Sequence, residues 1–150
     1  MSDPADAASD GRATETIRAR GHEHVTARHA STLEITTDDF LTPAGDCILA
    51  IEADRAPADF DPAFVAAARD EGATITVTVA AGGHETTITG RGDPRLSFES
   101  DRSAVCRTSD YVDDRTILVE ADAAAADLDR ALVDALADGA AARASVAVER

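Results

Sequence analysis

The feature that most constrains how this chain can fold is a repeat inside it. Residues 46–70, DCILAIEADRAPADFDPAFVAAARD, align with residues 114–138, DRTILVEADAAAADLDRALVDALAD, and twelve of the 25 positions are identical. The bias of the chain towards Ala and Asp would give about four matches by chance. A long period that occurs only twice does not suit a solenoid. The repeat therefore indicates two similar half-domains.

Each copy of the repeat predicts the same order of elements. An apolar strand (47–52 or 116–120) leads into an Asp-rich turn, which is followed by a helix and a second strand. Asp61 and Asp129 stand where a side chain can accept hydrogen bonds from the free N–H groups of the first helical turn. Further alternating strands precede each copy, and the two glycines of AGGHETT predict a tight hairpin.

These patterns predict an α+β fold with two helices, in which duplicated β-β-α-β units form one domain over residues 17–150. The pseudo-repeats cover about 20–80 and 91–149. The element order resembles that of the cradle-loop barrels, so a small β-barrel-like domain is one predicted architecture. A sandwich of two halves is the other. Residues 1–16 are polar and acidic without periodicity, which predicts a disordered tail.

The charge composition is unusual even for an acidic protein. The chain has 29 Asp and Glu against 14 basic residues, all of them arginine, for a net charge of −15, and it contains no Lys, Asn, Gln or Trp. This profile resembles the proteins of extremely halophilic archaea. At about 1 M salt the Debye length shrinks to roughly 3 Å, so the negative charge would not repel nucleic acid at a distance. Acidity alone therefore does not exclude a nucleic-acid partner.

The cysteines and the hydropathy indicate a cytoplasmic protein without a membrane partner. Cys47 and Cys106 allow one disulfide at most, and they lack the CxxC spacing of a zinc or redox site, so free thiols are expected. No apolar stretch approaches the ~20 residues that cross a bilayer. The N-terminal residues also lack the apolar segment of a signal peptide.

Three segments of the chain together resemble a known family. They are RGHEHVTARHASTLEIT (20–36), LTPAGDCILAIEAD (41–54) and VCRTSDYVDDRTILVEAD (105–122). In this order they are similar to DUF371, an archaeal family of unknown function, and the resemblance covers nearly the whole chain beyond the acidic tail. It implies an archaeal cytosolic protein with no assigned activity. It brings no functional residues, so a site must be argued from chemistry.

The repeat itself points to a candidate site. Asp46-Cys47 aligns with Asp114-Arg115, and a pseudo-twofold axis would bring these two turns together. Arginine binds phosphate and carboxylate in a forked geometry. We therefore expect a non-enzymatic module that binds a small anionic ligand or a nucleic-acid phosphate near this axis. The predicted ligand-binding residues are Asp46, Cys47, Arg107, Ser109, Asp114 and Arg115.

Other roles for the same residues stay open. A thiol-dependent hydrolase or acyl-transfer enzyme would use Cys47 as nucleophile, His22 or His29 as base, and an arginine to stabilise negative charge. The simpler alternative is that Cys47 is a small buried hydrophobe and that the arginines pair with neighbouring aspartates. A structural or interaction protein is a third class.

Metal binding finds weak support in the sequence. His22 and His24 would share a face of a strand, but their spacing matches no zinc signature. We therefore predict no metal site and expect the histidines to pin turns through hydrogen bonds. The sequence identifies neither a cofactor nor an oligomeric state.

Overall fold

The structure is a computed structural model that describes residues 12–150 of the chain. Residues 1–11, which make up most of the predicted tail, lie outside the described residues. The first strand begins at Arg12, so residues 12–16 of the predicted tail belong to a strand. β1 therefore begins five residues before the predicted boundary at residue 17.

The described chain forms eight strands, two α-helices and two single-turn 3-10 helices. In chain order they are β1 (Arg12–Arg20), β2 (Thr32–Thr36), β3 (Ile48–Ala50), η1 (Pro57–Asp59), α2 (Pro62–Ala68), β4 (Thr74–Ala81), β5 (His84–Arg91), β6 (Ser103–Arg107), β7 (Thr116–Leu118), η2 (Ala125–Asp127), α3 (Arg130–Ala137) and β8 (Ala141–Glu149).

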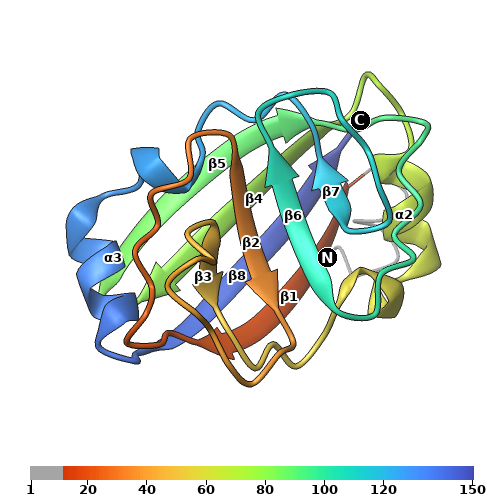
Figure 1. The fold of residues 1–150 in the computed structure, drawn as a ribbon. Coiled ribbons are helices and arrows are strands. Elements are labelled where there is room, and N and C mark those ends of the chain that lie inside the picture. The colour runs from red at the N-terminus through yellow and green to blue at the C-terminus, as the bar shows by residue number, and fades with distance from the viewer. Residues whose placement is uncertain (1–11) are drawn as a thin grey trace.

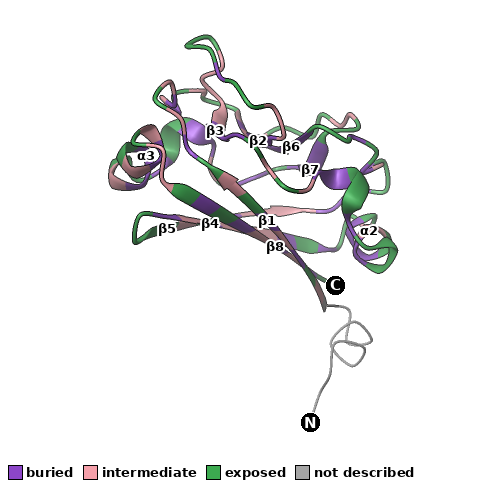
Figure 2. Ribbon diagram, turned by 90° about the horizontal axis from the view of Figure 1, so that it is seen from below, coloured by how far each residue is buried: buried purple, intermediate pink, exposed green. Residues whose placement is uncertain are grey.

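The strands form two sheets that face each other (Figures 1 and 2). Sheet A has the order β1-β8-β4-β5 and is antiparallel throughout. Sheet B has the order β3-β2-β6-β7, with an antiparallel centre and a parallel strand at each edge. Each sheet takes strands from both the first and the second half of the chain. The two halves therefore interlock rather than form one layer each.

The mixed α+β class with two α-helices is confirmed, but no closed barrel is present among the described residues. The two sheets meet at their edges only through single isolated bridges, Arg20 with Ile51 and Arg91 with Val119. Closing a barrel needs a continuous, staggered ladder between neighbouring strands. Because β3 and β7 are only three residues long, they supply no such ladder. The barrel-like architecture is therefore replaced by two facing sheets.

The core lies between the sheets, and the helices close its two ends (Figure 2). Alternate residues of the strands point inward, such as Val77 and Val146 in sheet A and Leu33 in sheet B, and each is almost fully buried. Asp61 and Asp129 cap α2 and α3 as expected, accepting hydrogen bonds from the N–H groups of Ala63 at 2.8 Å and Ala131 at 3.1 Å.

The Glu-Ala-Asp segment shared by the two repeats forms the same turn twice. Glu52 and Glu120 both have positive φ angles, 55° and 52°. The carboxylate of Glu52 pairs with Arg20, and that of Glu120 pairs with Arg91 at 2.6 Å. Left-handed backbone is unfavourable for a residue other than glycine, and these ion pairs hold it in place. The shared motif is thus a structural turn that attaches sheet B to the edges of sheet A.

The aspartate of each turn completes this attachment. The side chain of Asp54 accepts a hydrogen bond from the N–H of Arg18 at 2.8 Å, and Asp122 accepts one from the N–H of Thr89 at 2.9 Å. The N–H of each aspartate in turn donates to the carbonyl of the same residue. Arg18 in β1 and Thr89 in β5 therefore occupy matching positions.

Two glycines, Gly21 and Gly92, allow the backbone of each α-helix to approach the neighbouring chain closely. A Cβ on Gly21 would overlap the carbonyl oxygen of Leu136 in α3, and one on Gly92 would overlap that of Ala68 in α2. We expect Gly21→Ala and Gly92→Ala each to lower the free energy of unfolding by about 2–3 kcal/mol, because overpacking must move backbone. Urea denaturation followed by circular dichroism measures this loss.

The control for this prediction is Gly72→Ala. A Cβ there would lie 3.3 Å from a side-chain oxygen of Asp70 and would touch no backbone, so a change below about 1 kcal/mol is expected. Equal effects of all three substitutions would contradict the proposed close contacts.

Candidate ligand-binding site

Cys47 and Arg115 lie on either side of the centre of sheet B. Cys47 immediately precedes β3 and Arg115 immediately precedes β7. Their carbonyls accept hydrogen bonds from the N–H groups of Glu34, at 2.9 Å, and Val105, at 2.8 Å. Glu34 and Val105 are themselves directly opposite each other in the antiparallel pair β2–β6. The two turns that the sequence aligned therefore flank one central pair of residues.

The functional groups of this region lie on the face of sheet B that points away from the core. Leu33 and Ile35 point inward and are buried, so Glu34 between them points outward and is half-buried. The Cys47 thiol contacts the Glu34 carboxylate, with 3.6 Å between Sγ and Oε1. The hydrogen-bond partners of this thiol are thus a carboxylate and the Thr32 hydroxyl, rather than a cation or an imidazole.

The environment of Cys47 keeps its thiol protonated. Burial raises the pKa, the negative charges of Glu34 and Asp46 add to the effect, and a hydrogen bond from Thr32 opposes it, giving a pKa of about 11. A nucleophilic cysteine needs a lowered pKa, because the thiolate is the reactive form. The proximity of Arg115 does not reverse the balance. These surroundings do not activate Cys47 as a nucleophile.

Neither candidate histidine base is hydrogen-bonded to Cys47 in residues 12–150. His29 Nδ1 accepts from the N–H of Thr32 at 3.1 Å and lies 3.0 Å from the Thr32 hydroxyl. His22 Nδ1 accepts from the N–H of His24 at 3.0 Å. Both rings therefore fix local turns, and Thr32 stands between His29 and Cys47.

Arg107 and Arg115 share one aspartate. A guanidinium nitrogen of Arg107 donates to Asp113 at 3.0 Å, and one of Arg115 donates to the same oxygen at 3.1 Å. Arg107 also donates to the hydroxyl of Thr116 at 2.7 Å, and its guanidinium lies 4.7 Å from the ring centre of Tyr111. The Arg–Asp network that the sequence offered as an alternative is therefore present.

The shared aspartate is held in its charged form. Burial acts to raise the pKa of Asp113, but hydrogen bonds from Arg115 and the positive charge of Arg107 outweigh it and lower the pKa to about 2. Asp113 thus carries a full negative charge between two guanidinium groups at neutral pH. Asp113 therefore neutralises part of the positive charge of Arg107 and Arg115, which the sequence analysis expected to bind an anionic ligand.

Three of the predicted ligand-binding residues, Asp46, Asp114 and Ser109, form hydrogen bonds to the backbone of nearby loops. The backbone carbonyls of Asp46 and Asp114 accept hydrogen bonds from the loops that precede β2 and β6. The Ser109 hydroxyl accepts from the N–H of Tyr111 at 3.3 Å. Of the predicted set, the structure gathers Cys47, Arg107 and Arg115 on the outer face of sheet B.

Sequence reasoning missed Glu34, which is central to this cluster. The available signal was its position: in TLEIT the glutamate alternates with two core residues, so it had to point away from the core. The pattern did not show that Glu34 would contact Cys47. This contact depends on the pairing of β2 with β3, which no local feature of the sequence specifies.

Metal ligands are not clustered in the described part of the chain. No group of three or more His, Cys, Asp or Glu side chains there could hold a metal ion. His22 and His24 have ring centres 5.1 Å apart, and the described residues supply no third ligand. Both cysteines are free, and no described helix has the length and apolar character to span a membrane.

The raised pKa of Cys47 predicts slow alkylation. In a Cys106→Ala background, iodoacetamide should modify Cys47 at pH 7.5 about two orders of magnitude more slowly than a free thiol, because so little thiolate is present. Glu34→Gln should speed the reaction by removing a charge that raises the pKa. Mass spectrometry of the modified fraction measures both rates. A rate that levels off below pH 8 would show an activated thiol and contradict the prediction.

Comparison with known proteins agrees with the resemblance seen in the three sequence segments. A family model described as a domain of unknown function, DUF371, matches residues 17–149. The uncharacterized protein MJ0206 of the archaeon Methanocaldococcus jannaschii is 38% identical over 123 residues, which cover 82% of this chain and 90% of that protein. The family match runs through both sheets and both α-helices. The chain therefore belongs to the DUF371 family.

Proposed function

We propose that this protein is a non-enzymatic binding module that holds a small anionic ligand on the outer face of sheet B, with Arg115 as the main contact. The observation that carries the proposal is the state of the Arg115 guanidinium. One of its nitrogens donates to Asp113, while 46% of the side chain remains exposed. Its other nitrogens make no hydrogen bond within the described chain, so they are available to an oxygen anion.

Arg115 suits this role better than Arg107. The Arg107 side chain is only 11% exposed and is already bonded to Asp113 and Thr116. A buried guanidinium with partners on two sides supports the site rather than meets the ligand. Arg107 and Asp113 thus hold Arg115 in position, and a positioned arginine loses less conformational freedom when it binds.

The charges around Arg115 also restrict the ligand. Burial acts to lower the pKa of Arg115, whereas Asp113, Glu34 and Cys47 raise it. At neutral pH the thiol of Cys47 is protonated, so the negative groups near the guanidinium are the carboxylates of Asp113 and Glu34. A ligand that carries only negative charge would meet repulsion from Glu34. A small carboxylate or phosphate that also carries an O–H or N–H group fits better, because Glu34 can accept that hydrogen bond.

The thiol-dependent enzyme is less well supported. Its nucleophile would have to work with a pKa of about 11, beside a carboxylate and without a hydrogen-bonded imidazole in the described chain. A nucleic-acid phosphate is the second candidate occupant of the Arg115 site, and an oligonucleotide probe distinguishes it from a small ligand.

The test of this function is titration followed by nuclear magnetic resonance. With malate, a carboxylate that carries a hydroxyl, signals at the starts of β3 and β7 should shift, and Arg115→Ala should weaken binding about tenfold. The control is Arg102→Ala, because Arg102 is 62% exposed but bound through two nitrogens to Asp38. It should bind like the wild type.

Inorganic phosphate and a short oligothymidine serve as further probes in this titration. If the oligonucleotide binds at Arg115 more tightly than the small probes, the ligand of this site is nucleic acid and not a small anion. If no probe shifts these signals, or if Arg115→Ala binds all of them unchanged, the proposal is overturned.

We also infer that the chain arose by internal duplication and forms one domain. The aligned segments 46–70 and 114–138 support this inference, together with the recurrent Glu-Ala-Asp turns and the matching aspartate contacts at Arg18 and Thr89. The same element order occurs on each side of the β4–β5 hairpin. We further propose that the protein acts in the cytoplasm, where its two free thiols would stay reduced.

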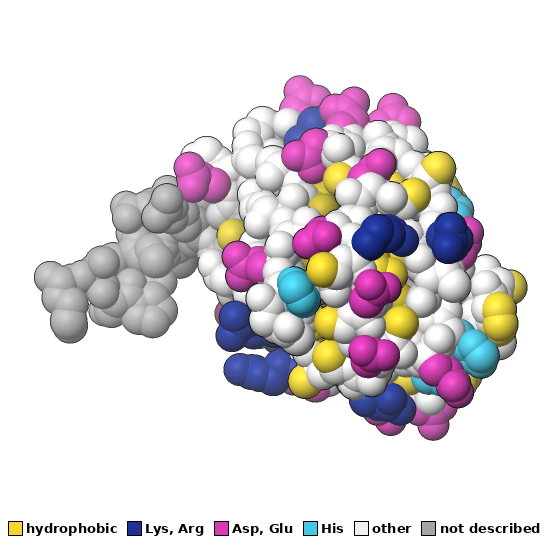
Figure 3. Space-filling model, turned by 90° about the vertical axis from the view of Figure 1, so that its left-hand side faces the viewer, with side chains coloured by type: hydrophobic (Ala, Val, Ile, Leu, Met, Phe, Trp, Pro, Cys, Tyr) yellow, Lys and Arg dark blue, Asp and Glu magenta, His cyan; other side chains and the backbone are white. Residues whose placement is uncertain are grey.

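A third inference is adaptation to high salt. It rests on the net charge of −15 and on a basic set made entirely of arginine. Figure 3 shows one side of the molecule, on which acidic side chains are spread over the surface rather than gathered in a single patch. Such a surface repels itself at low ionic strength and is screened at high ionic strength.

The salt adaptation predicts a direction of change in thermal stability. Raising KCl from about 0.05 M to about 2 M should increase the melting temperature, because the Debye length falls from more than 10 Å to less than 3 Å and self-repulsion is screened. Scanning calorimetry measures the shift. Sucrose, which stabilises compact states without screening charge, is the control. A melting temperature that falls or stays constant in KCl would contradict the inference.

A further inference from the structure

The outer face of sheet A carries two arginines in direct opposition. Arg18 in β1 and Arg143 in β8 are partners in the antiparallel register. Their neighbours Ile17, Ala142 and Ala144 are buried, whereas both arginines are exposed. The two side chains therefore project from the same face, with their Cβ atoms about 4.5–5.5 Å apart.

Neither guanidinium has a partner within residues 12–150. Outside the strand ladder, Arg18 is hydrogen-bonded in the described chain through its backbone alone, which pairs with Asp54. Arg143 forms only the backbone pairing of β8. By contrast, Arg91, Arg102 and Arg115 each donate to a carboxylate. In a chain with about twice as many acidic as basic residues, two adjacent unpaired arginines are an exception.

This opposition has an energetic cost in the absence of a ligand, since like charges directly across a sheet repel each other. Two carboxylates lie in the surroundings. Asp54 sits at the strand edge, bound to the backbone of Arg18, and Glu85 is the partner of Ala80, which separates it from Arg143 across the sheet. Neither forms an ion pair with the two guanidinium groups. Their positive charge is therefore available to an external anion.

A hollow accompanies the arginine pair. It has a volume of about 390 Å³ and is lined by Arg18, Arg143, small residues of β4 and β8, and the turn Gly82-Gly83. Both glycines have positive φ angles, 57° and 79°. Next to Gly83 there is no atom within 4 Å of the place a Cβ would occupy. The hollow has the volume of a site for a small molecule, and its floor is made of alanine and glycine.

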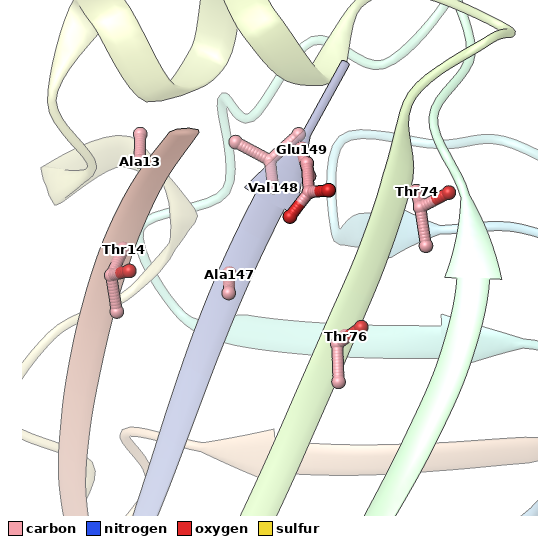
Figure 4. Close-up of a pocket in the computed structure, with 7 residues that line it drawn as sticks. All are labelled: Ala13, Thr14, Thr74, Thr76, Ala147, Val148 and Glu149. Atoms are coloured by element: carbon pink, nitrogen blue, oxygen red, sulfur yellow. The ribbon is translucent and has the colours of Figure 1, made fainter. Parts of the chain in front are cut away.

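A second hollow on the same sheet provides a comparison within the molecule. It has a volume of about 380 Å³ and lies at the other end of the strands, where Thr14, Ala147 and Thr76 stand side by side on three neighbouring strands (Figure 4). Its described lining includes the acid Glu149 and no basic residue. Of these two similar hollows, one is therefore basic and the other is not.

We propose that Arg18 and Arg143 bind the phosphoryl group of a small phosphate monoester in the hollow beside the Gly82-Gly83 turn. A monoester is close to a dianion at neutral pH, and two guanidinium groups match its charge and its three terminal oxygens. A carboxylate is satisfied by the fork of one arginine. The site lies on a different sheet from Arg115, so it does not depend on the function proposed above.

The experiment is a titration with glycerol phosphate, with inorganic phosphate and oligothymidine as parallel probes. Backbone signals of Arg18, Arg143 and Gly83 should shift with glycerol phosphate, and Arg18→Ala or Arg143→Ala should weaken binding about tenfold or more. Arg28→Ala is the matched control, because Arg28 is exposed and its side chain has no partner in the described chain. Arg28→Ala should bind like the wild type. Arg115→Ala acts on the site of sheet B, so it should leave the shifts of Arg18, Arg143 and Gly83 unchanged, whatever it does to signals at the starts of β3 and β7.

The free energy of unfolding of each variant, measured without a ligand, shows whether lost binding results from misfolding. Arg18→Ala and Arg143→Ala should be at least as stable as the wild type, because each removes the repulsion of the pair. The proposal is overturned if glycerol phosphate shifts none of these signals, or if the two substitutions leave its affinity unchanged. Tighter binding of oligothymidine than of glycerol phosphate at these residues would also overturn it, in favour of nucleic acid.

Discussion

The pairing of β4 with β8 is the contact on which the rest of the molecule depends. These two strands form the centre of sheet A, although β4 lies in the middle of the chain and β8 lies near its C-terminal end. β2 and β6 form the centre of sheet B in the same way. Neither half of the chain can complete either sheet alone. The Cys47–Arg115 region, which takes one residue from each half, therefore exists only in the assembled domain.

The sequence predicted those features of the fold that depend on neighbouring residues, and the common element order of its two similar segments. The aspartate caps of both α-helices, the apolar strands and the alternation of LEI in β2 all follow from the pattern of neighbouring residues. The sequence placed Cys47 and Arg115 at corresponding positions of two similar segments, and each is hydrogen-bonded to one of the opposed residues Glu34 and Val105. The barrel did not form, because the lengths of β3 and β7 depend on packing that the apolar pattern leaves unspecified.

The chemistry of the site was less accessible from the sequence, for a physical reason. The pKa of Cys47 depends on burial and on Glu34, which stands thirteen positions earlier and meets it only through sheet pairing. The opposition of Arg18 and Arg143 depends on the register of β1 against β8. A sequence pattern gives the face on which each residue lies, but not the residue it meets across 125 positions of chain.

The Glu-Ala-Asp turns also cover part of the open edges of sheet A. Beside the last residues of β1 and β5, each turn uses the backbone groups that an edge strand would otherwise present: Arg20 pairs with Ile51, Arg91 pairs with Val119, and the aspartates bind the residue two positions before each arginine. An edge filled in this way offers no template there for an added strand from another chain. A repeated motif that carries no ligand chemistry thus protects a β-rich protein against edge-to-edge aggregation.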